Sequence, residues 1–308
     1  MKIWHSLDAR DPETERPLVV AIGFFDGMHR GHQEIARRTL RLRKPGWRSA
    51  ALTFANHPAS FLRPGMEPPL LTTPEERLDL IAAAGFDECF FVRFDERIAS
   101  ITAQDFLDET LVSGLGARGV VVGKNFRFGN KRAGDTTLMR AVLSQRGVEC
   151  VLVENTADDR GERISSTRIR EYVAQGDLET ADRLLGHSYE LRGPVVLGAG
   201  RGHDLRFPTA NVEMPHKLLP KDGVYAAVAR VDGRDYAALV SIGTNPTFDG
   251  TKRTVEAWLR DFHETIYGHQ LSLRDLRFVR EQQRFESKEA LQAQMDHDLL
   301  AVAYPSFG

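Results

Sequence analysis

Apolar runs and amphipathic stretches alternate along the first half of the chain. Short uninterrupted apolar runs between polar segments are typical of buried strands. We predict such strands over residues 18–22, 49–54, 89–94, 119–122 and 149–153. Between them, apolar side chains at helical spacing predict helices over residues 33–42, 74–84, 102–111 and 136–145. This alternation predicts an α/β fold in which a parallel sheet carries helices on both faces.

The second half of the chain has a different pattern. Two short helices are predicted over residues 165–175 and 178–185, and the boundary between two domains, 1–186 and 187–308, is expected just after them. Short strands separated by Gly, Pro and Asp then follow, at residues 224–231, 236–242, 254–259 and 271–279. Asp232-Gly233 between two of these strands is a hairpin signal. We therefore predict a small antiparallel β-barrel, closed by a helix over residues 287–303.

Composition narrows the class of protein. The chain has 308 residues with 41 basic and 43 acidic side chains, so it lacks the basic excess that is usual in nucleic-acid-binding proteins. It has no signal-peptide pattern, and none of its apolar runs approaches the length of about 18 residues that a membrane span needs. Cys89 and Cys150, each beside apolar residues, are expected to be buried free thiols. We therefore expect a cytoplasmic protein with no nucleic-acid or membrane partner.

The most informative segment is G-F-F-D-G-M-H-R-G-H, residues 23–32, where the first predicted strand turns into the first predicted helix. Free N–H groups and the dipole of a helix N-terminus attract anions, and glycine lets phosphate oxygens approach the backbone. His29 and His32 lie three residues apart, on one face of the first helical turn, so both can donate to one phosphate. The arrangement suits nucleotidyl transfer. A lone His-x-Gly-His is equally consistent with a turn that holds incidental histidines.

This segment resembles the H-x-G-H signature of the nucleotidylyltransferase superfamily, and its Phe-Asp-Gly is similar to the bacterial bifunctional riboflavin kinase/FAD synthetase family in particular. The resemblance covers nearly the whole chain and implies a Rossmann-like adenylyltransferase domain. It implies that His29 and His32 are catalytic and hold the ATP triphosphate. The nucleotide-binding residues that it implies here are Gly23, Phe24, Phe25, Asp26, Gly27 and Gly31. For Asp26 a solvated turn residue is the alternative.

Other segments of the first half extend the resemblance. The segment T-F-A-N-H-P, residues 53–58, keeps the family's histidine as His57, whereas Asn56 replaces a commoner proline. The loop V-G-K-N-F-R-F-G and the run I-S-S-T-R, residues 122–129 and 164–168, also match the family. Flavin-binding roles are implied for His57, Asn125, Phe126 and Phe128, and nucleotide-binding roles for Ser165, Ser166, Thr167 and Arg168. The two phenylalanines could instead be core aromatics, and the serines ordinary helix caps.

The segment G-A-G-R-G-H-D-L-R-F-P-T-A-N, residues 198–211, resembles the riboflavin kinase loop. The roles that this implies are Mg²⁺ binding by Thr209 and Asn211 and nucleotide binding by Gly200 and Gly202. The downstream segments 255–256 and 280–285 also match this family, and they imply general base catalysis by Glu256 and flavin binding by Arg280. An outward charge on a barrel strand is the alternative for Glu256. His203 and Arg206 depart from the family's arginine and glycine, which puts kinase efficiency in doubt.

The resemblance thus implies a bifunctional enzyme that phosphorylates riboflavin to FMN and adenylylates FMN to FAD with release of pyrophosphate. ATP, riboflavin and FMN are the implied small-molecule partners, and Mg²⁺ the implied cofactor. The alternatives are an FMN adenylyltransferase with an impaired kinase domain, or a flavin-binding regulator without turnover. A homo-oligomer is left open.

Overall fold

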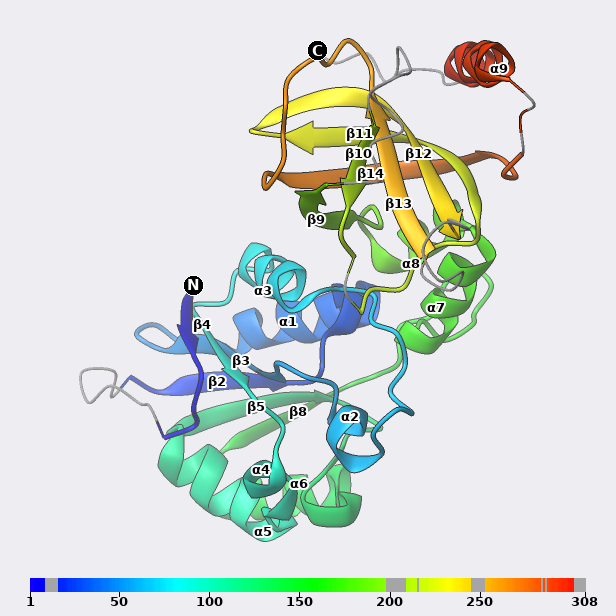
Figure 1. Ribbon diagram of the computed structural model, residues 1–308. Helices are drawn as coiled ribbons and strands as arrows, with labels where there is room; N and C mark the ends of the chain where they lie inside the picture. The colour runs from blue at the N-terminus through cyan, green and yellow to red at the C-terminus, as the bar shows by residue number, and fades with distance from the viewer. Residues whose placement is uncertain are drawn as a thin grey trace. The chain divides into compact units, whose positions relative to one another are not determined.

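The structure is a computed structural model of the 308-residue chain. It describes residues 1–8, 16–197, 209–214, 216–244, 253–283, 285 and 287–301. The chain packs as two compact units, Met1–Ser166 and Thr167–Gly308 (Figure 1). The first unit is an α/β domain and the second contains a β-barrel. The domain boundary near residue 186 stays a prediction.

A six-stranded parallel sheet forms the first unit, in the order β1-β4-β3-β2-β5-β8. Its strands are β1 (Lys2–Trp4), β2 (Leu18–Ile22), β3 (Arg48–Phe54), β4 (Glu88–Val92), β5 (Ala117–Gly123) and β8 (Glu149–Val153). Strands β3 and β4 follow β2 in the chain and extend the sheet on one side of it, whereas β5 and β8 extend the sheet on the other side. The order of strands therefore reverses between β2 and β5. In open α/β sheets, ligands bind outside the carboxyl ends of the strands at such a point. The glycine-rich segment follows β2 directly.

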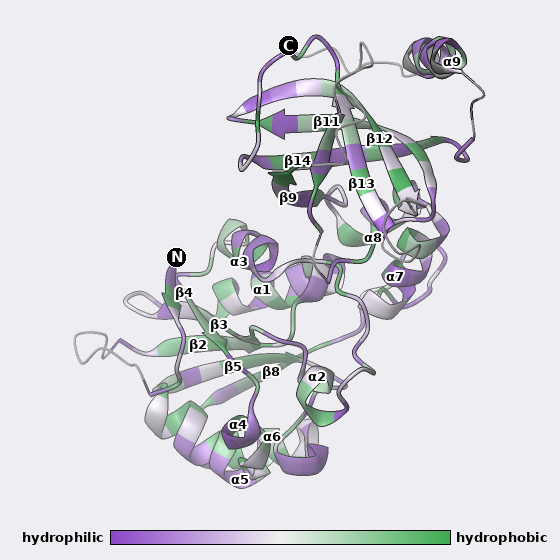
Figure 2. Cartoon of the chain, viewed as in Figure 1, coloured by the Kyte–Doolittle hydropathy of each residue, from purple (hydrophilic) through white to green (hydrophobic). Residues whose placement is uncertain are grey.

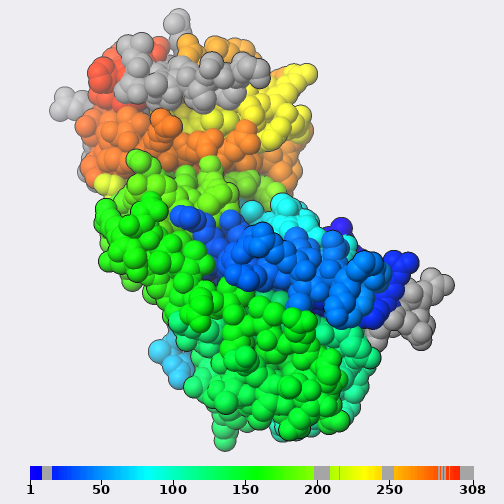
Figure 3. Space-filling model, turned by 180° about the vertical axis from the view of Figure 1, so that it is seen from behind, coloured from blue at the N-terminus to red at the C-terminus, as the bar shows by residue number. Residues whose placement is uncertain are grey.

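Helices cover both faces of this sheet, as predicted (Figure 1). They are α1 (Arg30–Leu42), α2 (Pro58–Leu62), α3 (Pro74–Ala83), α4 (Glu96–Ser100), α5 (Ala103–Asp105), the π-helix η3 (Phe106–Gly114) and α6 (Thr136–Gln145). Strand β2 shows the two faces: Val19 packs in one apolar cluster with Ile81 of α3, and Val20 in another with Met139 of α6. Figure 2 shows the apolar strands between these helices. From behind, α1 is the blue band on the surface of this unit (Figure 3).

The second unit begins with two short helices and continues into a closed antiparallel barrel, as predicted, in the order β10-β13-β12-β11-β14-β9. Its helices are α7 (Ser166–Gln175), α8 (Leu178–Leu185) and α9 (Lys288–Ala301), and its strands are β9 (Leu191–Val196), β10 (Thr209–Val212), β11 (Gly223–Val231), β12 (Arg234–Thr244), β13 (Arg253–Leu259) and β14 (Gln270–Arg280). Asp232 and Gly233 form the predicted turn between β11 and β12, with the positive φ angles, 48° and 79°, that two-residue hairpin turns favour.

The described side chains of helix α9 contact the barrel through an apolar cluster and an ion pair. Met295 contacts the cluster of Val224, Leu239 and Trp258. The Arg280 Nε donates to both carboxylate oxygens of Asp298, at 3.0 and 2.9 Å, and Asp298 is 1% exposed. None of the described helices is long and apolar enough to cross a membrane.

Asp298→Ala is expected to destabilise the barrel by about 3–5 kcal/mol, because it leaves the mostly buried guanidinium of Arg280 without its carboxylate. Chemical denaturation that follows the barrel's own transition measures the change. Asp296→Ala on the same helix is the control, since Asp296 is exposed and its loss should change the unfolding free energy by no more than about 0.5 kcal/mol. Equal effects of the two substitutions would contradict the role of the buried ion pair.

Candidate active sites

The turn after β2 has an unusual backbone. Phe25, Gly27 and Met28 all have positive φ, at 57°, 73° and 38°. Such a conformation suits glycine, but it is rare for a bulky side chain and is maintained only where the surroundings enforce it. Here Phe25 is fully buried, and its ring also fills the space that a side chain on Gly23 would need. The turn is therefore held rigidly at the carboxyl end of β2.

His29 is the N-cap residue of α1. Its Nδ1 accepts a hydrogen bond from the backbone N–H of His32 at 3.3 Å, so the neutral ring carries its proton on Nε2. The two imidazoles stack with ring centroids 3.7 Å apart. A Cβ on Gly31 would lie 3.1 Å from the His29 ring, which explains the glycine between the histidines. The structure thus brings the two predicted catalytic histidines together at the start of a helix.

The environment of His32 keeps its ring neutral. Burial is the larger cause that holds the pKa of His32 well below its usual value, and the neighbouring His29 is the second cause. Its Nδ1 is buried and has no hydrogen-bond partner in the described part of the chain, so a proton on Nε2 is the less costly tautomer. The Phe25 ring packs against the His32 ring in a T-shaped arrangement. A neutral His32 can therefore offer its Nε2–H beside His29 without placing two charges in contact.

Asp26 connects two loops through hydrogen bonds of its buried carboxylate. The alternative of a solvated turn residue is wrong. The residue is 1% exposed. Its carboxylate accepts from the backbone N–H of Leu71 at 3.0 Å, and from the N–H and the hydroxyl of Thr72, each at 3.0 Å. The same Thr72 hydroxyl accepts from the N–H of Gly27 at 3.2 Å. The carboxylate thus fixes the glycine-rich turn against the segment that enters α3. Its predicted role in nucleotide binding stays a prediction.

Asp26→Asn is expected to lower the unfolding free energy by about 1–3 kcal/mol, because one acceptor oxygen becomes an amide donor facing buried donors. Urea denaturation measures the loss. Glu75→Gln is the charge-matched control, since Glu75 lies exposed close by in α3. A loss no larger in Asp26→Asn than in Glu75→Gln would contradict this connecting role of Asp26.

The structure brings Ser166 to the same turn, although 140 residues separate it from Asp26. The Ser166 hydroxyl donates to the backbone carbonyl of Asp26 at 3.2 Å. Thr167 and Arg168 follow at the start of α7, within the second compact unit, where the Arg168 guanidinium lies 5.6 Å from the ring of Tyr172. The roles of Ser165 to Arg168 toward phosphate stay predictions.

The predicted flavin-binding residues of the first unit have different surroundings. His57 caps α2 through its Nδ1, which accepts from the N–H of Ala59 at 3.1 Å, and its ring meets Phe24 edge-on at 4.7 Å. The Asn125 amide lies 3.4 Å from that of Asn155. Phe126 and Phe128 stack on each other, and Phe128, 6% exposed, belongs to the apolar core. The burial of Phe128 favours the core alternative for this residue.

Asn56, which replaces the family's commoner proline, has a structural role. Its side chain accepts from the backbone N–H of Phe94 at 2.8 Å and donates to the carbonyl of Phe94 at 3.0 Å. The amide thus joins the segment after β3 to the segment after β4.

The residues proposed for the second site share one face of the barrel wall. Asn211 of β10 pairs with Glu256 of β13. Thr209 and Trp258, each two residues away on the same two strands, also pair with each other. Alternate residues of a strand point to the same face, so these four side chains lie together. Trp258 packs in the cluster that α9 covers, which makes this the outer face. Glu256 is half-buried on this outer face, a position that fits both the predicted general base and the alternative of an outward charge on a barrel strand.

Ser241, which the sequence analysis did not name, lies next to the predicted general base. It pairs with Glu256 across β12 and β13, and its hydroxyl accepts from the Gln282 amide at 3.1 Å. Only the register of the strands reveals it. Arg280, expected at the flavin, is instead bound to Asp298, so a flavin contact stays a prediction. Four loop positions from the sequence analysis lie outside the described residues: Gly200, Gly202, His203 and Arg206.

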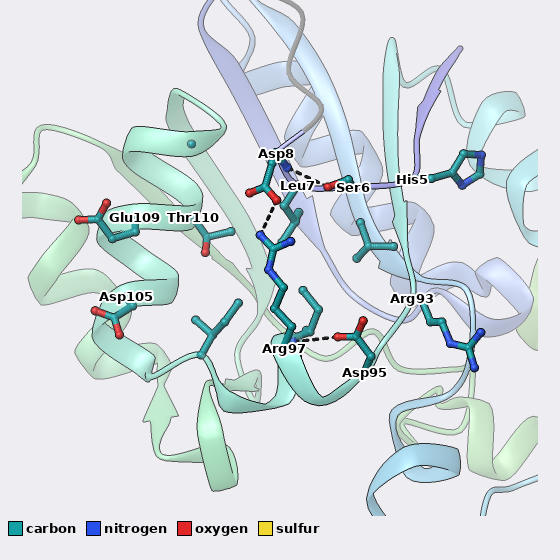
Figure 4. A pocket seen from close by; sticks show the side chains of 14 residues that line it. His5, Ser6, Leu7, Asp8, Arg93, Asp95, Arg97, Asp105, Glu109 and Thr110 are labelled. Atoms are coloured by element: carbon teal, nitrogen blue, oxygen red, sulfur yellow. Dashed lines mark hydrogen bonds and ion pairs between the residues drawn. The ribbon is translucent and has the colours of Figure 1, made fainter.

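A cavity of about 330 Å³ lies in another part of the first unit, beside the segments that follow β1 and β4 (Figure 4). Arg97 and Asp8, which form an ion pair, are among the residues that line it. The predicted site residues are not among those that line it. The glycine-rich turn is therefore separate from this cavity.

Comparisons with known proteins identify the family of the chain. The FAD synthetase family model matches residues 11–168, and the riboflavin kinase model matches residues 185–303. Bifunctional riboflavin kinase/FMN adenylyltransferases of Listeria monocytogenes and Escherichia coli are 35% and 33% identical, over 94% and 98% of this chain and 92% and 97% of theirs. A crystal structure from Streptococcus pneumoniae, described as a macrolide-efflux protein, superposes with a TM-score of 0.87 at 30% identity and covers 99% of this chain and 100% of that one. The chain belongs to the bifunctional riboflavin kinase/FMN adenylyltransferase family.

Proposed function

We propose that this protein phosphorylates riboflavin to FMN and then adenylylates FMN to FAD, with ATP as the second substrate of both reactions. The observation that supports the proposal is that one chain holds two separate groups of side chains whose chemistry suits phosphate transfer. One is the stacked histidine pair at the N-terminus of α1, and the other is Glu256 between Asn211 and Ser241 on the barrel.

In adenylyl transfer the FMN phosphate attacks the α-phosphorus of ATP, and pyrophosphate leaves. A phosphate monoester is already ionised at neutral pH, so the reaction depends on position and on neutralising negative charge. The Nε2–H groups of His29 and His32 and the free N–H groups of the α1 N-terminus supply that charge stabilisation. The rigid turn at Phe25 and Gly27 keeps these donors in place before substrate binds.

In riboflavin phosphorylation the 5′-hydroxyl of riboflavin attacks the γ-phosphorus of ATP, the bond from the γ-phosphorus to the bridging oxygen breaks and ADP leaves, and Glu256 accepts the hydroxyl proton. Thr209 and Asn211 present neutral oxygens on the face that carries Glu256, which fits Mg²⁺ bound mainly through ATP phosphates and water. The described residues hold no cluster of three or more His, Cys, Asp or Glu side chains that would form an all-protein metal site. Bound Mg²⁺ would neutralise the phosphate charge.

Chromatography of flavins after incubation of the protein with riboflavin, ATP and Mg²⁺ tests this function. We expect FMN to appear first and FAD to follow, with pyrophosphate released in the second step. FAD from supplied FMN but no FMN from riboflavin would indicate an impaired kinase domain. Flavin binding without ATP consumption would indicate a regulator.

ATP dependence and two free cysteines support a cytoplasmic location.

A further inference from the structure

We propose that Arg77 is a positioning residue for adenylyl transfer, whose buried guanidinium joins the glycine-rich turn after β2 to the His57 segment after β3. The inference rests on the proposed adenylyl transfer. Arg77 lies in α3 and is fully buried, although its position in the sequence is that of an ordinary helical arginine.

The guanidinium makes one contact to each loop. One terminal nitrogen donates to the carbonyl of Ala55 at 3.0 Å, just after β3, and the other lies 3.4 Å from the carbonyl of Phe24, just after β2. The planar group also lies over the Phe24 ring, 4.2 Å from its centroid. The same ring meets the edge of His57 at 4.7 Å. A single side chain therefore connects the backbone of both loops and the aromatic ring between them.

The electrostatics of Arg77 do not suit a residue that serves stability alone. No carboxylate forms an ion pair with it within the described ranges, and its Nε is buried without a hydrogen-bond partner. Burial lowers the pKa of Arg77 to about 10, while the Asp26 charge acts in the opposite direction. The group stays charged at neutral pH. Because an uncompensated buried charge is costly, an apolar side chain would serve the fold better.

The shape of arginine explains its use at this position. A guanidinium is a rigid planar fork that can donate to two carbonyls while its face rests on an aromatic ring. An ammonium is a point charge without that fork, so lysine cannot reproduce the same bridge. The Phe24 carbonyl also accepts from the Thr53 hydroxyl at 2.9 Å, so it stays satisfied when Arg77 is replaced. Loss of Arg77 should therefore loosen the two loops relative to each other without unfolding the sheet.

Arg77→Met and Arg77→Lys test this inference in the full-length protein. We expect kcat for FAD formation from FMN to fall about 10- to 100-fold in both variants, because small displacements of positioned groups have effects of this size. KM for FMN should change less than kcat. Riboflavin phosphorylation by the same molecules should stay unchanged and serves as the internal control. The melting temperature of Arg77→Met should be unchanged or higher, a result that a merely structural role would not produce.

Leu143→Ala is the matched stability control, since Leu143 is fully buried in α6, in the cluster on the opposite face of the sheet from Ile81 of α3. It should lower the melting temperature and keep FAD formation at temperatures well below melting. A wild-type kcat in Arg77→Met or Arg77→Lys would contradict the proposed positioning role of Arg77. A loss of FAD formation that is explained entirely by loss of folded protein would contradict it as well. Absence of FAD formation by the wild type would instead contradict the proposed function.

Discussion

His29→Ala is expected to lower the rate of FAD formation from FMN about 100- to 1,000-fold, which is typical for loss of one preorganised donor to developing phosphate charge. FMN formation from riboflavin should stay nearly intact, because Glu256 and Asn211 lie in the other compact unit. Flavin chromatography in two reactions, one supplied with riboflavin and one with FMN, measures both activities on the same preparation.

His29 has a second role that needs its own control. As the N-cap of α1 it accepts from the N–H of His32, so His29→Ala also removes a cap that is worth about 1 kcal/mol. His29→Asn keeps an N-cap acceptor and lacks the imidazole Nε2–H. We expect the asparagine variant to regain stability but not FAD formation. If FMN and FAD formation fell together in folded variants, the assignment of two separate sites would be wrong.

The elements that the sequence predicted best have buried and regular surroundings. Strand β2 is buried along its whole length, and its apolar run therefore stands out. Strand β1 was missed because only three residues form it at the sheet edge, and two of them are exposed. Strand β9 was missed because Gly193 and Pro194 interrupt it. The structure requires this glycine, since a Cβ there would lie 2.0 Å from the carbonyl oxygen of Glu213.

The site was predictable where local sequence determines the chemistry. A glycine-rich strand–helix junction with two histidines indicates phosphate binding from a short segment alone, because glycine, helix terminus and imidazole act within that segment. The tasks of Asp26 and Arg77 depend on partners 45 and 53 residues away, and no local pattern shows that these charges are buried. Asp298 is similar: charged residues Asp296 and Asp298 alternate with His297 in the sequence, which shows no sign of burial, and the structure places the Asp298 carboxylate against Arg280.

Glu256→Gln is expected to lower FMN formation from riboflavin by about 10²- to 10⁴-fold, the usual contribution of a general base. Glutamine keeps the size of the side chain and its position between Asn211 and Ser241, but it cannot take the proton of the attacking hydroxyl. FAD formation from supplied FMN should persist, since the histidine pair of the first unit is unchanged. The effect is thus the reverse of that expected for His29→Ala.

Thr209→Ala is the control that separates base catalysis from metal binding at this site. It removes one neutral oxygen ligand, so FMN formation should fall through weaker binding of Mg²⁺ and nucleotide, and added Mg²⁺ should partly restore it. Added Mg²⁺ should not restore Glu256→Gln, because the missing group there is the proton acceptor. Initial rates of FMN formation over a Mg²⁺ titration, with FAD formation from FMN followed in parallel, distinguish the two defects. Wild-type FMN formation by Glu256→Gln would make Glu256 a structural residue of β13, and the base would then have to be another group on the same face of the barrel.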